Sequence, residues 1–491
     1  MKAGNLFMKS NYKIDIGEFN DADISGITYN SRDIKPGNIF FAIKGLKEDG
    51  NRFINDAINK GAKIIFSESE SGHYGDAIIV TVKDIRKKMA QLSKAFYTNG
   101  LENMKLIGIT GTNGKTTTTF LVKSILEYSG YSAGLIGTIG YKIGNTEYQS
   151  SLTTPDSVEL NKILGQMEKE RVQFCVMEVS SVALEFDRVY GLDFDCAVFT
   201  NLTSEHMDYH KTIENYFYAK KILFDGLSSN SLSVSNGDDA FGQKILEDSK
   251  SKKFYYSIKN KSDLRAINES LTMSGLEFDA VIGNKSNHFR SNLSGRFNIY
   301  NILASVSAVL KYDISIKSAA DALQNFGEVK GRFNKIMLNN GAVAVIDYSH
   351  TSDSIKNAIE AAREIVNAEN KNGKVITIFG CGGDKDKSKR PVMGKFASEL
   401  SDFAIITSDN PRSEDPFSII DEIVSGITGE KNYEIIEDRD KAIRRGLEIS
   451  EEGDIVLICG KGHENYQEIK GKKIHFDDKE VVEKYMNITG K

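Results

Sequence analysis

A glycine- and threonine-rich turn followed by a lysine is the stretch of this sequence most suited to binding a phosphate. It comes after an apolar run, residues 106–109, and before a helical pattern that continues to Tyr128. Backbone N–H groups at a helix start attract an anion, a lysine there neutralises outer phosphates, and a threonine hydroxyl can reach a magnesium ion. The glycines are closer together than in the usual phosphate loop, so an ordinary turn before a helix is the alternative. The predicted nucleotide contacts here are Gly111, Thr112, Asn113, Gly114, Lys115, Thr116 and Thr117.

Two further segments place polar side chains directly after apolar runs. Glu178 ends the run 174–178, and His206 and His210 follow the run 196–200. Because open α/β sheets bind ligands at the carboxyl ends of their strands, a carboxylate and two imidazoles there could hold a metal ion. The alternative is structural: Glu178 would cap a helix, and the two histidines would be solvated loop residues.

The helical pattern of residues 213–224 contains two adjacent lysines, Lys220 and Lys221, which interrupt its apolar face. A lysine in such a position usually lays its aliphatic stem along the protein and keeps its charge in water. Taken alone, the pattern therefore favours an ordinary surface role for one of these lysines.

Four polar loops follow apolar runs in the last third of the chain. They are residues 347–351, 380–391, 408–412 and 460–464, and they are rich in charged residues, Gly and Asn. If the runs before them are parallel strands, the loops meet at one edge of a sheet and form a binding surface for a small charged molecule. Turn chemistry explains any single loop, since Gly, Asp and Asn occur in turns everywhere.

The order of strand-like and helical patterns divides the chain of 491 residues into three α/β units. We predict units at 1–102, 103–329 and 330–491, because a chain of this length exceeds what one core usually serves. Regular alternation of apolar runs and helical patterns is typical of parallel sheets covered by helices on both faces. That alternation is clearest in the third unit.

Composition is that of an ordinary globular protein. Charged residues make up 27% of the chain and the net charge is -5, which disfavours a general nucleic-acid binder. Four widely separated cysteines form no CxxC pair, so we expect buried thiols in a reducing compartment. No apolar stretch approaches the length of a membrane span or a signal peptide, so we expect a cytoplasmic protein without membrane insertion.

Taken in order, these motifs resemble the Mur ligases, the ATP-dependent enzymes that add amino acids to the peptide stem of the cell-wall precursor. The resemblance covers nearly the whole chain. It rests on Gly-Thr-Asn-Gly-Lys-Thr, Met-Glu-Val-Ser-Ser, His-Met-Asp-Tyr-His, the Ala-Lys220 helix, Asp-Tyr-Ser-His-Thr and Gly-Lys-Gly-His-Glu. The N-terminal Ser-Arg-Asp segment, Thr-Thr-Pro and Asp-Asn-Pro-Arg are similar to the branch of the family that adds meso-2,6-diaminopimelate. The family fold implies an N-terminal domain for the UDP substrate, a central ATPase-like domain with a parallel sheet, and a C-terminal Rossmann-like domain for the amino acid.

The resemblance also implies a reaction. The D-glutamyl γ-carboxylate of UDP-N-acetylmuramoyl-L-alanyl-D-glutamate would attack the γ-phosphate of ATP, and an amine of the diamino acid would displace phosphate from the resulting acyl phosphate. The expected cofactors are ATP and Mg²⁺. The expected partners are the two substrates, with no nucleic acid, and the chain is expected to act as a monomer. Because every species on this path is anionic, the site must supply positive charge and exclude water.

Individual residues receive roles from the same resemblance. Lys115 and Thr116 would handle the phosphates and one magnesium ion, and Glu178 and His206 would be further metal ligands. Lys220 matches a carbamylated lysine, which would ligate a second magnesium. The nucleotide would also meet Asn301, Arg332 and His350. The sugar-peptide substrate would be held by Ser31, Thr153, Thr154, Ser180 and Arg188. The diamino acid would be read by Lys385, Asp409, Asn410, Pro411, Arg412, Gly460 and Glu464.

One departure leaves the incoming amino acid open. Lys385 stands where the diaminopimelate-adding enzymes carry arginine, and a lysine lacks the bidentate grip of a guanidinium on a carboxylate. Lanthionine and L-lysine therefore stay alternatives, and L-lysine is the less favoured of the two because it lacks the second carboxylate that Arg412 would bind. A folate or poly-amino-acid ligase of the same superfamily is a further alternative, as is a phosphate-loop switch ATPase.

Overall fold

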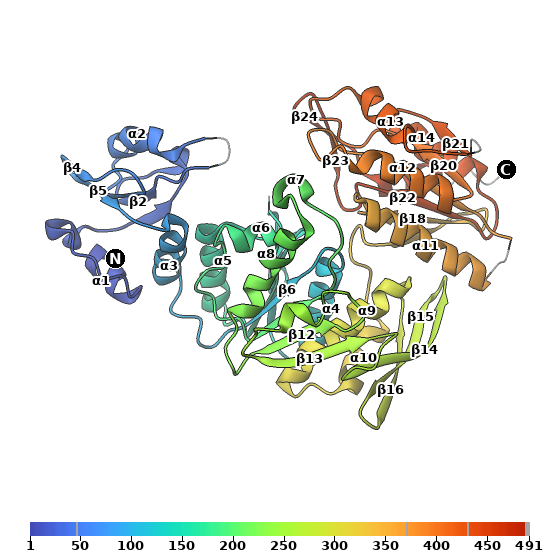
Figure 1. Ribbon diagram of the computed structural model, residues 1–491, viewed down its shortest axis with the longest axis horizontal. Coiled ribbons are helices and arrows are strands. Elements are labelled where there is room, and N and C mark those ends of the chain that lie inside the picture. The colour runs from blue at the N-terminus through green and yellow to red at the C-terminus, as the bar shows by residue number, and fades with distance from the viewer. Residues whose placement is uncertain (46–47, 151, 370–371, 430–431, 487–491) are drawn as a thin grey trace.

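The computed structural model describes residues 1–45, 48–150, 152–369, 372–429 and 432–486. Three α/β bodies follow one another along the chain (Figure 1), built on sheets of five, eleven and six strands. The predicted three-domain α/β fold is therefore confirmed, whereas its boundaries at 1–102, 103–329 and 330–491 stay predictions. No helix among the described residues is long and apolar enough to cross a membrane.

The first body, blue in Figure 1, has the strand order β1-β2-β3-β5-β4. Phe41 and Phe66 stack in its core, with ring centroids 5.0 Å apart. One contact to the second body is a hydrogen bond of 3.1 Å from the Tyr29 hydroxyl to Asp156 Oδ2. Its elements are α1 Ala3–Lys9, β1 Gly26–Thr28, β2 Asn38–Phe41, α2 Ile54–Asn59, β3 Ile64–Ser67, β4 Gly72–Tyr74, β5 Ala77–Thr81 and α3 Ile85–Tyr97.

The second body places β6 (Lys105–Thr110) inside a sheet of order β16-β15-β14-β13-β12-β11-β6-β10-β7-β8-β9. Both neighbours of β6 run parallel to it, so three carboxyl ends meet at one edge. The other strands are β7 Ala133–Gly137, β8 Gly140–Ile143, β9 Thr146–Tyr148, β10 Phe174–Glu178, β11 Cys196–Phe199, β12 Leu232–Asn236, β13 Lys252–Ser257, β14 Leu264–Thr272, β15 Gly275–Ile282 and β16 Lys285–Ser291.

The predicted parallel sheet consists of the neighbouring strands β7, β10, β6, β11, β12, β13 and β14. Antiparallel strands extend it on both sides, β8 and β9 next to β7, and β15 and β16 next to β14. Residues 264–291 give weak strand signals because only one face of these strands is buried. On that face Phe278 and Phe289 stack, with centroids 5.1 Å apart. The helices are α4 Lys115–Tyr128, α5 Ser157–Lys169, α6 Ser181–Glu185, α7 Met207–His210, α8 Ile213–Asp225, α9 Arg296–Val309 and α10 Ile316–Gln324.

The third body, orange to red in Figure 1, has the strand order β17-β18-β22-β19-β20-β21. Separate apolar clusters lie on its two faces, which confirms the predicted sheet wrapped on both sides. The apolar runs before the four polar loops form the parallel strands β18, β19, β20 and β22, whereas β17, antiparallel to β18, and the hairpin β23–β24 were not predicted. Elements are β17 Asn334–Met337, β18 Val343–Asp347, α11 Ser352–Glu369, β19 Val375–Phe379, α12 Lys389–Leu400, β20 Phe403–Ile406, α13 Pro416–Val424, β21 Tyr433–Ile435, α14 Arg439–Ile449, β22 Ile455–Cys459, β23 Tyr466–Ile469, β24 Lys472–His475 and α15 Asp478–Tyr485. All four cysteines are buried and free, as expected.

Candidate active site

The loop between β6 and α4 folds around the lysine that follows it. Lys115 Nζ donates to Gly111 O at 2.9 Å and to Thr112 O at 2.8 Å. Burial lowers the pKa of Lys115, and the nearby Glu205 carboxylate opposes that shift. Gly114 has a φ of +86°, and a Cβ there would overlap the Asn301 amide oxygen, so only glycine fits between the loop and α9. The predicted nucleotide contact Asn301 therefore lies directly against the loop.

Residues after β11 hold the tip of the loop. The Asn113 amide donates to Asn201 Oδ1 at 2.9 Å, and Thr200 Oγ1 donates to Asn113 O at 2.6 Å. The Thr112 hydroxyl accepts from the Thr203 amide at 3.0 Å. The tip is thus fixed in place by side chains and backbone of the neighbouring strand end.

The third body reaches the same loop from the other side. Arg332 Nη2 donates to Thr116 Oγ1 at 3.1 Å, and Asp353 Oδ2 accepts from Asn113 Nδ2 at 2.9 Å. His350 Nε2 lies 3.8 Å from Glu205 Oε1. Arg332 therefore reaches the start of α4, and His350 lies beside Glu205, whereas their contact with the nucleotide stays a prediction. Asp353 was not predicted, because an aspartate in the first turn of a helix is ordinarily explained by the helix itself.

The two adjacent lysines of α8 have different environments. Lys220 is 1% exposed, its Nζ donates to Gly111 O at 2.9 Å, and its ammonium lies 4.2 Å from the Tyr216 ring centroid. Burial, reinforced by Lys115, holds the pKa of Lys220 well below its ordinary value. Lys221 instead pairs with Asp225 and Asp248 at 2.5 and 2.7 Å. Lys220 therefore contacts the phosphate loop from α8 and is not a surface lysine.

Glu178 and the two histidines do not converge as a three-ligand metal group. Glu178 accepts from the Thr138 amide at 2.8 Å and from its hydroxyl at 3.1 Å, so it does not cap α6. His206 is half-exposed, whereas His210 is buried and its Nε2 lies 2.8 Å from Ser181 Oγ. Among the described residues no group of three or more His, Cys, Asp and Glu side chains could hold a metal. Magnesium, which usually takes one or two carboxylates together with phosphate oxygens, does not require such a group.

Glu205 is a site residue that the sequence reasoning missed. Its carboxylate lies 3.9 Å from His206 Nε2 as well as near His350. Burial alone would raise the pKa of Glu205, but His206, Lys115, His350 and Lys220 outweigh it and lower the pKa. The only available signal was its position directly before His206. Glu205 therefore supplies the negative charge among the cations of the loop.

The predicted sugar-peptide contacts of the second body lie together beside Glu178. Thr154 Oγ1 donates to Glu178 O at 2.9 Å, and Arg188 Nη1 donates to Thr154 O at 2.8 Å. The Thr153 and Thr138 hydroxyls are 3.1 Å apart, and the Ser180 amide donates to Thr154 Oγ1 at 3.0 Å. Ser31 belongs to the first body, where its carbonyl accepts from Lys60. The Tyr29–Asp156 contact brings the segment of Ser31 toward this group.

The loops after β20 and β22 form a second polar cluster. Asn410 Nδ2 donates to Glu464 Oε2 at 2.8 Å, and a Cβ on Gly460 would run into Asp409 Oδ2. Arg412 Nη1 donates to Gly383 O at 2.7 Å. Pro411 is buried beside this contact, and Lys385 is exposed on the loop that contains Gly383. Six of the seven predicted diamino-acid residues are thus packed together, with Lys385 at the rim.

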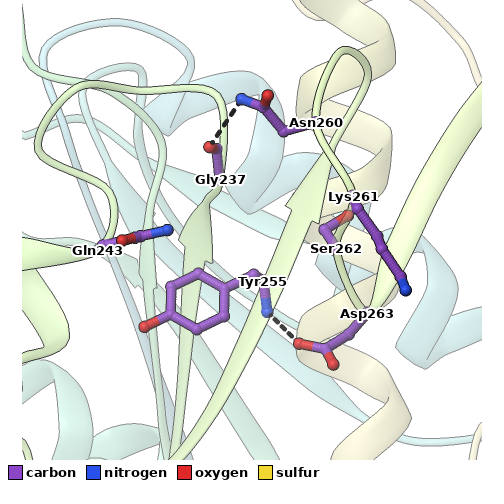
Figure 2. A pocket seen from close by; sticks show the side chains of 7 residues that line it. All are labelled: Gly237, Gln243, Tyr255, Asn260, Lys261, Ser262 and Asp263. Atoms are coloured by element: carbon purple, nitrogen blue, oxygen red, sulfur yellow. Dashed lines mark hydrogen bonds between the residues drawn. The ribbon is translucent and has the colours of Figure 1, made fainter.

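A separate hollow of about 660 Å³ lies beside the ends of β12 and β13 (Figure 2). Asn260 Nδ2 donates to the Gly237 carbonyl at 3.3 Å, and the Tyr255 amide donates to Asp263 Oδ2 at 2.8 Å. Figure 2 marks both hydrogen bonds with dashed lines. The other lining residues are Gln243, Lys261 and Ser262. None of the predicted site residues lines this hollow.

Family models match three segments that cover most of the chain. They are the Mur ligase family catalytic domain at 23–97, the Mur ligase middle domain at 109–309 and the Mur ligase glutamate ligase domain at 331–462. Together with the phosphate loop and the two polar clusters, these matches define the class of protein. The chain belongs to the Mur ligase family, a family of ATP-dependent ligases.

Curated relatives and a solved structure indicate the branch of the family. UDP-N-acetylmuramoyl-L-alanyl-D-glutamate--2,6-diaminopimelate ligase of Clostridium botulinum is 45% identical, covering 98% of each chain. Its Clostridium acetobutylicum counterpart, ligase 1, is 43% identical over 99% of each. A solved structure of a ligase with the same name is 30% identical, with a TM-score of 0.72 and 99% of each chain covered. MurF from Acinetobacter baumannii, 17% identical with a TM-score of 0.66, shares the fold.

Proposed function

We propose that this chain joins meso-2,6-diaminopimelate to the D-glutamyl γ-carboxylate of UDP-N-acetylmuramoyl-L-alanyl-D-glutamate at the expense of ATP. The observation that carries the proposal is the full-length identity of 45% to a ligase with that name, in a chain whose predicted nucleotide and amino-acid residues form two clusters. Lanthionine stays the alternative amine, because Lys385 replaces an arginine and is exposed at the rim of the second cluster.

The reaction needs activation because a carboxylate is a poor electrophile. An oxygen of the γ-carboxylate attacks the γ-phosphorus of ATP and ADP leaves, which gives an acyl phosphate. The amine nitrogen then attacks the acyl carbon, phosphate departs, and the nitrogen loses a proton. Lys115 and Arg332 stabilise the negative charge that both steps carry, because their cations lie at the phosphate loop and are partly shielded from water.

Magnesium would be held by Thr116, Glu178 and His206. The fit rests on Glu178, a carboxylate only 1% exposed whose Thr138 contacts leave room for a further cation on its oxygens. When bound, the ion neutralises charge on the phosphates. The chain's own part is to orient the loop through Asn113 and Thr112 and to close the site with Asp353.

Lys220 is proposed to carry a carbamate. A neutral amine adds carbon dioxide to give a carbamate and a proton, and burial, which lowers the pKa of Lys220, raises the fraction of neutral amine available for this addition. The change places an anion beside Lys115, where burial and the Lys115 charge disfavour a second ammonium. That sign suits a site in which further magnesium ligands are needed and a second ammonium would repel the first.

The three bodies are assigned by the same proposal. Residues 1–102 hold the UDP part of the substrate, 103–329 hold ATP, and 330–491 bring the diamino acid. The chain acts as a monomer, since every cluster that the reaction needs lies on one chain. It works in the cytoplasm, where ATP is available and thiols such as its four buried cysteines stay reduced.

A phosphate-release assay tests the proposal. The purified chain is given ATP and the UDP-N-acetylmuramoyl dipeptide together with meso-diaminopimelate, lanthionine or L-lysine, and the amide product is followed in parallel. We expect phosphate release only with both substrates, and fastest with meso-diaminopimelate. Release at the same rate without either substrate would instead indicate a switch ATPase, and faster turnover of lanthionine would reassign the amine.

A further inference from the structure

Lys461 is a completely buried cation at the end of β22. Its side chain has no exposed surface, although it belongs to the polar loop 460–464. Its Nζ donates to Asn410 Oδ1 at 3.1 Å and lies 3.7 Å from Asp409 Oδ1 and 3.6 Å from Glu464 Oε2. Buried lysines are rare unless they are paired, and Lys461 is paired with all three of these polar groups.

The contact with Lys461 fixes which way the Asn410 amide points. An ammonium has only donors, so it must face the amide oxygen, and the Glu468 amide donates to the same oxygen at 2.9 Å. The amide nitrogen is therefore turned toward Glu464 Oε2, 2.8 Å away. Lys461 and the Glu468 amide thus orient Asn410 together, and Asn410 in turn donates to the Glu464 carboxylate.

The cluster carries one more negative than positive charge. Arg439 is paired with Asp478 at 2.7 Å, and Arg412 lies 3.5 Å from Glu468, so these two pairs balance themselves. Apart from the exposed Lys385 at the rim, the remaining charged groups of the cluster are the carboxylates of Asp409 and Glu464 and the ammonium of Lys461. One negative charge is left over, which matches one ammonium of an incoming amino acid.

We propose that Lys461 is a positioning residue that orients Asn410 and Glu464 and sets the net charge of the pocket, and so selects a diamino acid with two carboxylates over L-lysine. The inference rests on the proposed function. meso-Diaminopimelate carries two ammonium and two carboxylate groups and is neutral overall, whereas L-lysine carries a net positive charge. A pocket that lost the Lys461 charge would hold an additional negative charge and would attract the cationic amino acid more strongly.

The test uses the full chain with Lys461→Met, which keeps the length of the side chain and removes its charge. We expect the KM for meso-diaminopimelate to rise about tenfold or more and the KM for ATP to change less than about threefold. The ratio of kcat/KM for meso-diaminopimelate to that for L-lysine is expected to fall about tenfold. A parallel rise of both KM values, or an unchanged ratio in the folded variant, overturns the proposal.

Two further variants separate charge, geometry and folding. Lys461→Gln still donates to Asn410 without a charge, so it should lose selectivity while its KM rises less, and it replaces the Met variant if that fails to fold. Arg363→Met is the matched control, because it removes a cation paired with Asp402 in the same body, just before β20 begins. It should change neither KM nor selectivity. If the unaltered chain joins no amine to the dipeptide, the proposed function fails, whereas an active chain with unchanged Lys461 variants refutes only this inference.

Discussion

Replacing Lys220 tests the central charge of the site, and its expected cost can be worked out from its contacts. Lys220→Ala removes buried methylenes, at about 2.5 kcal/mol in total, and one hydrogen bond to Gly111 O, at about 1 kcal/mol. Lys220→Met keeps most of the apolar volume, so it should lose only about 1 kcal/mol. Since burial already disfavours the charged amine, part of even that loss is offset.

Activity should fall far more than stability in both variants. We expect ligation by Lys220→Met to drop at least about a hundredfold, because a single preorganised group in a water-poor site contributes that much to rate. Its thermal unfolding should shift by only about 2–4 °C. The assay is amide formation from the UDP-N-acetylmuramoyl dipeptide, with thermal unfolding measured on the same preparation.

The carbamate makes a second, independent expectation. Short-chain carboxylates such as acetate should partly restore Lys220→Ala, because they can place an anion where the carbamate would lie, whereas bicarbonate should not, since alanine has no amine to modify. Lys221→Met is a suitable control, because Lys221 contacts Asp225 and Asp248 and not the loop. A folded Lys220→Met variant with near-normal ligation would remove the carbamate from the mechanism.

Three other predictions follow from single contacts. Arg412→Ala should raise the KM for the diamino acid at least about tenfold while leaving the KM for ATP nearly unchanged. Equal effects on the two KM values would show that the loop of Arg412 is not part of the diamino-acid site. Gly114→Ala should raise the KM for ATP and cost about 1–2 kcal/mol in urea unfolding, because φ is +86° and Asn301 blocks a Cβ. Burial lowers the pKa of His463 to about 4, so its contribution to stability is complete above about pH 6.5 and is lost as the pH falls toward 4. The free energy of unfolding of His463→Gln should therefore fall by up to about 3 kcal/mol less than that of the unaltered chain between about pH 6.5 and 4. The same pH dependence in both proteins over this range would contradict the prediction.

The fold was predictable where strands are buried on both faces. The runs 343–346, 375–379 and 455–459 are apolar except for Thr377, and they form β18, β19 and β22 in the middle of one sheet. Edge elements escaped prediction for the opposite reason. Strands β17 and β23 are only half-buried and β24 is exposed, so their residues carry no apolar pattern that marks a strand.

Motifs predicted the identities of many candidate site residues but not their partners. Nothing in the helical pattern 213–224 distinguishes Lys220 from Lys221, because both interrupt an apolar face and the difference lies in what packs against them. Lys220 meets the carbonyl of Gly111, which is 109 residues away in the chain. Such a contact depends on how α8 and the loop after β6 dock, which periodicity alone does not encode.

The same reasoning explains why the contacts between bodies were the hardest to foresee and why they matter for the chemistry. Arg332 and Asp353 belong to the body proposed to bring the amine, yet they bond Thr116 and Asn113 of the phosphate loop. If the two bodies separated, the loop would lose a cation and one of the contacts that hold its tip. Phosphoryl transfer would then depend on the docking that also brings the amine close, which limits the time that an acyl phosphate is exposed to water. These two contacts therefore couple the docking of the third body to the chemistry at the phosphate loop of the second body.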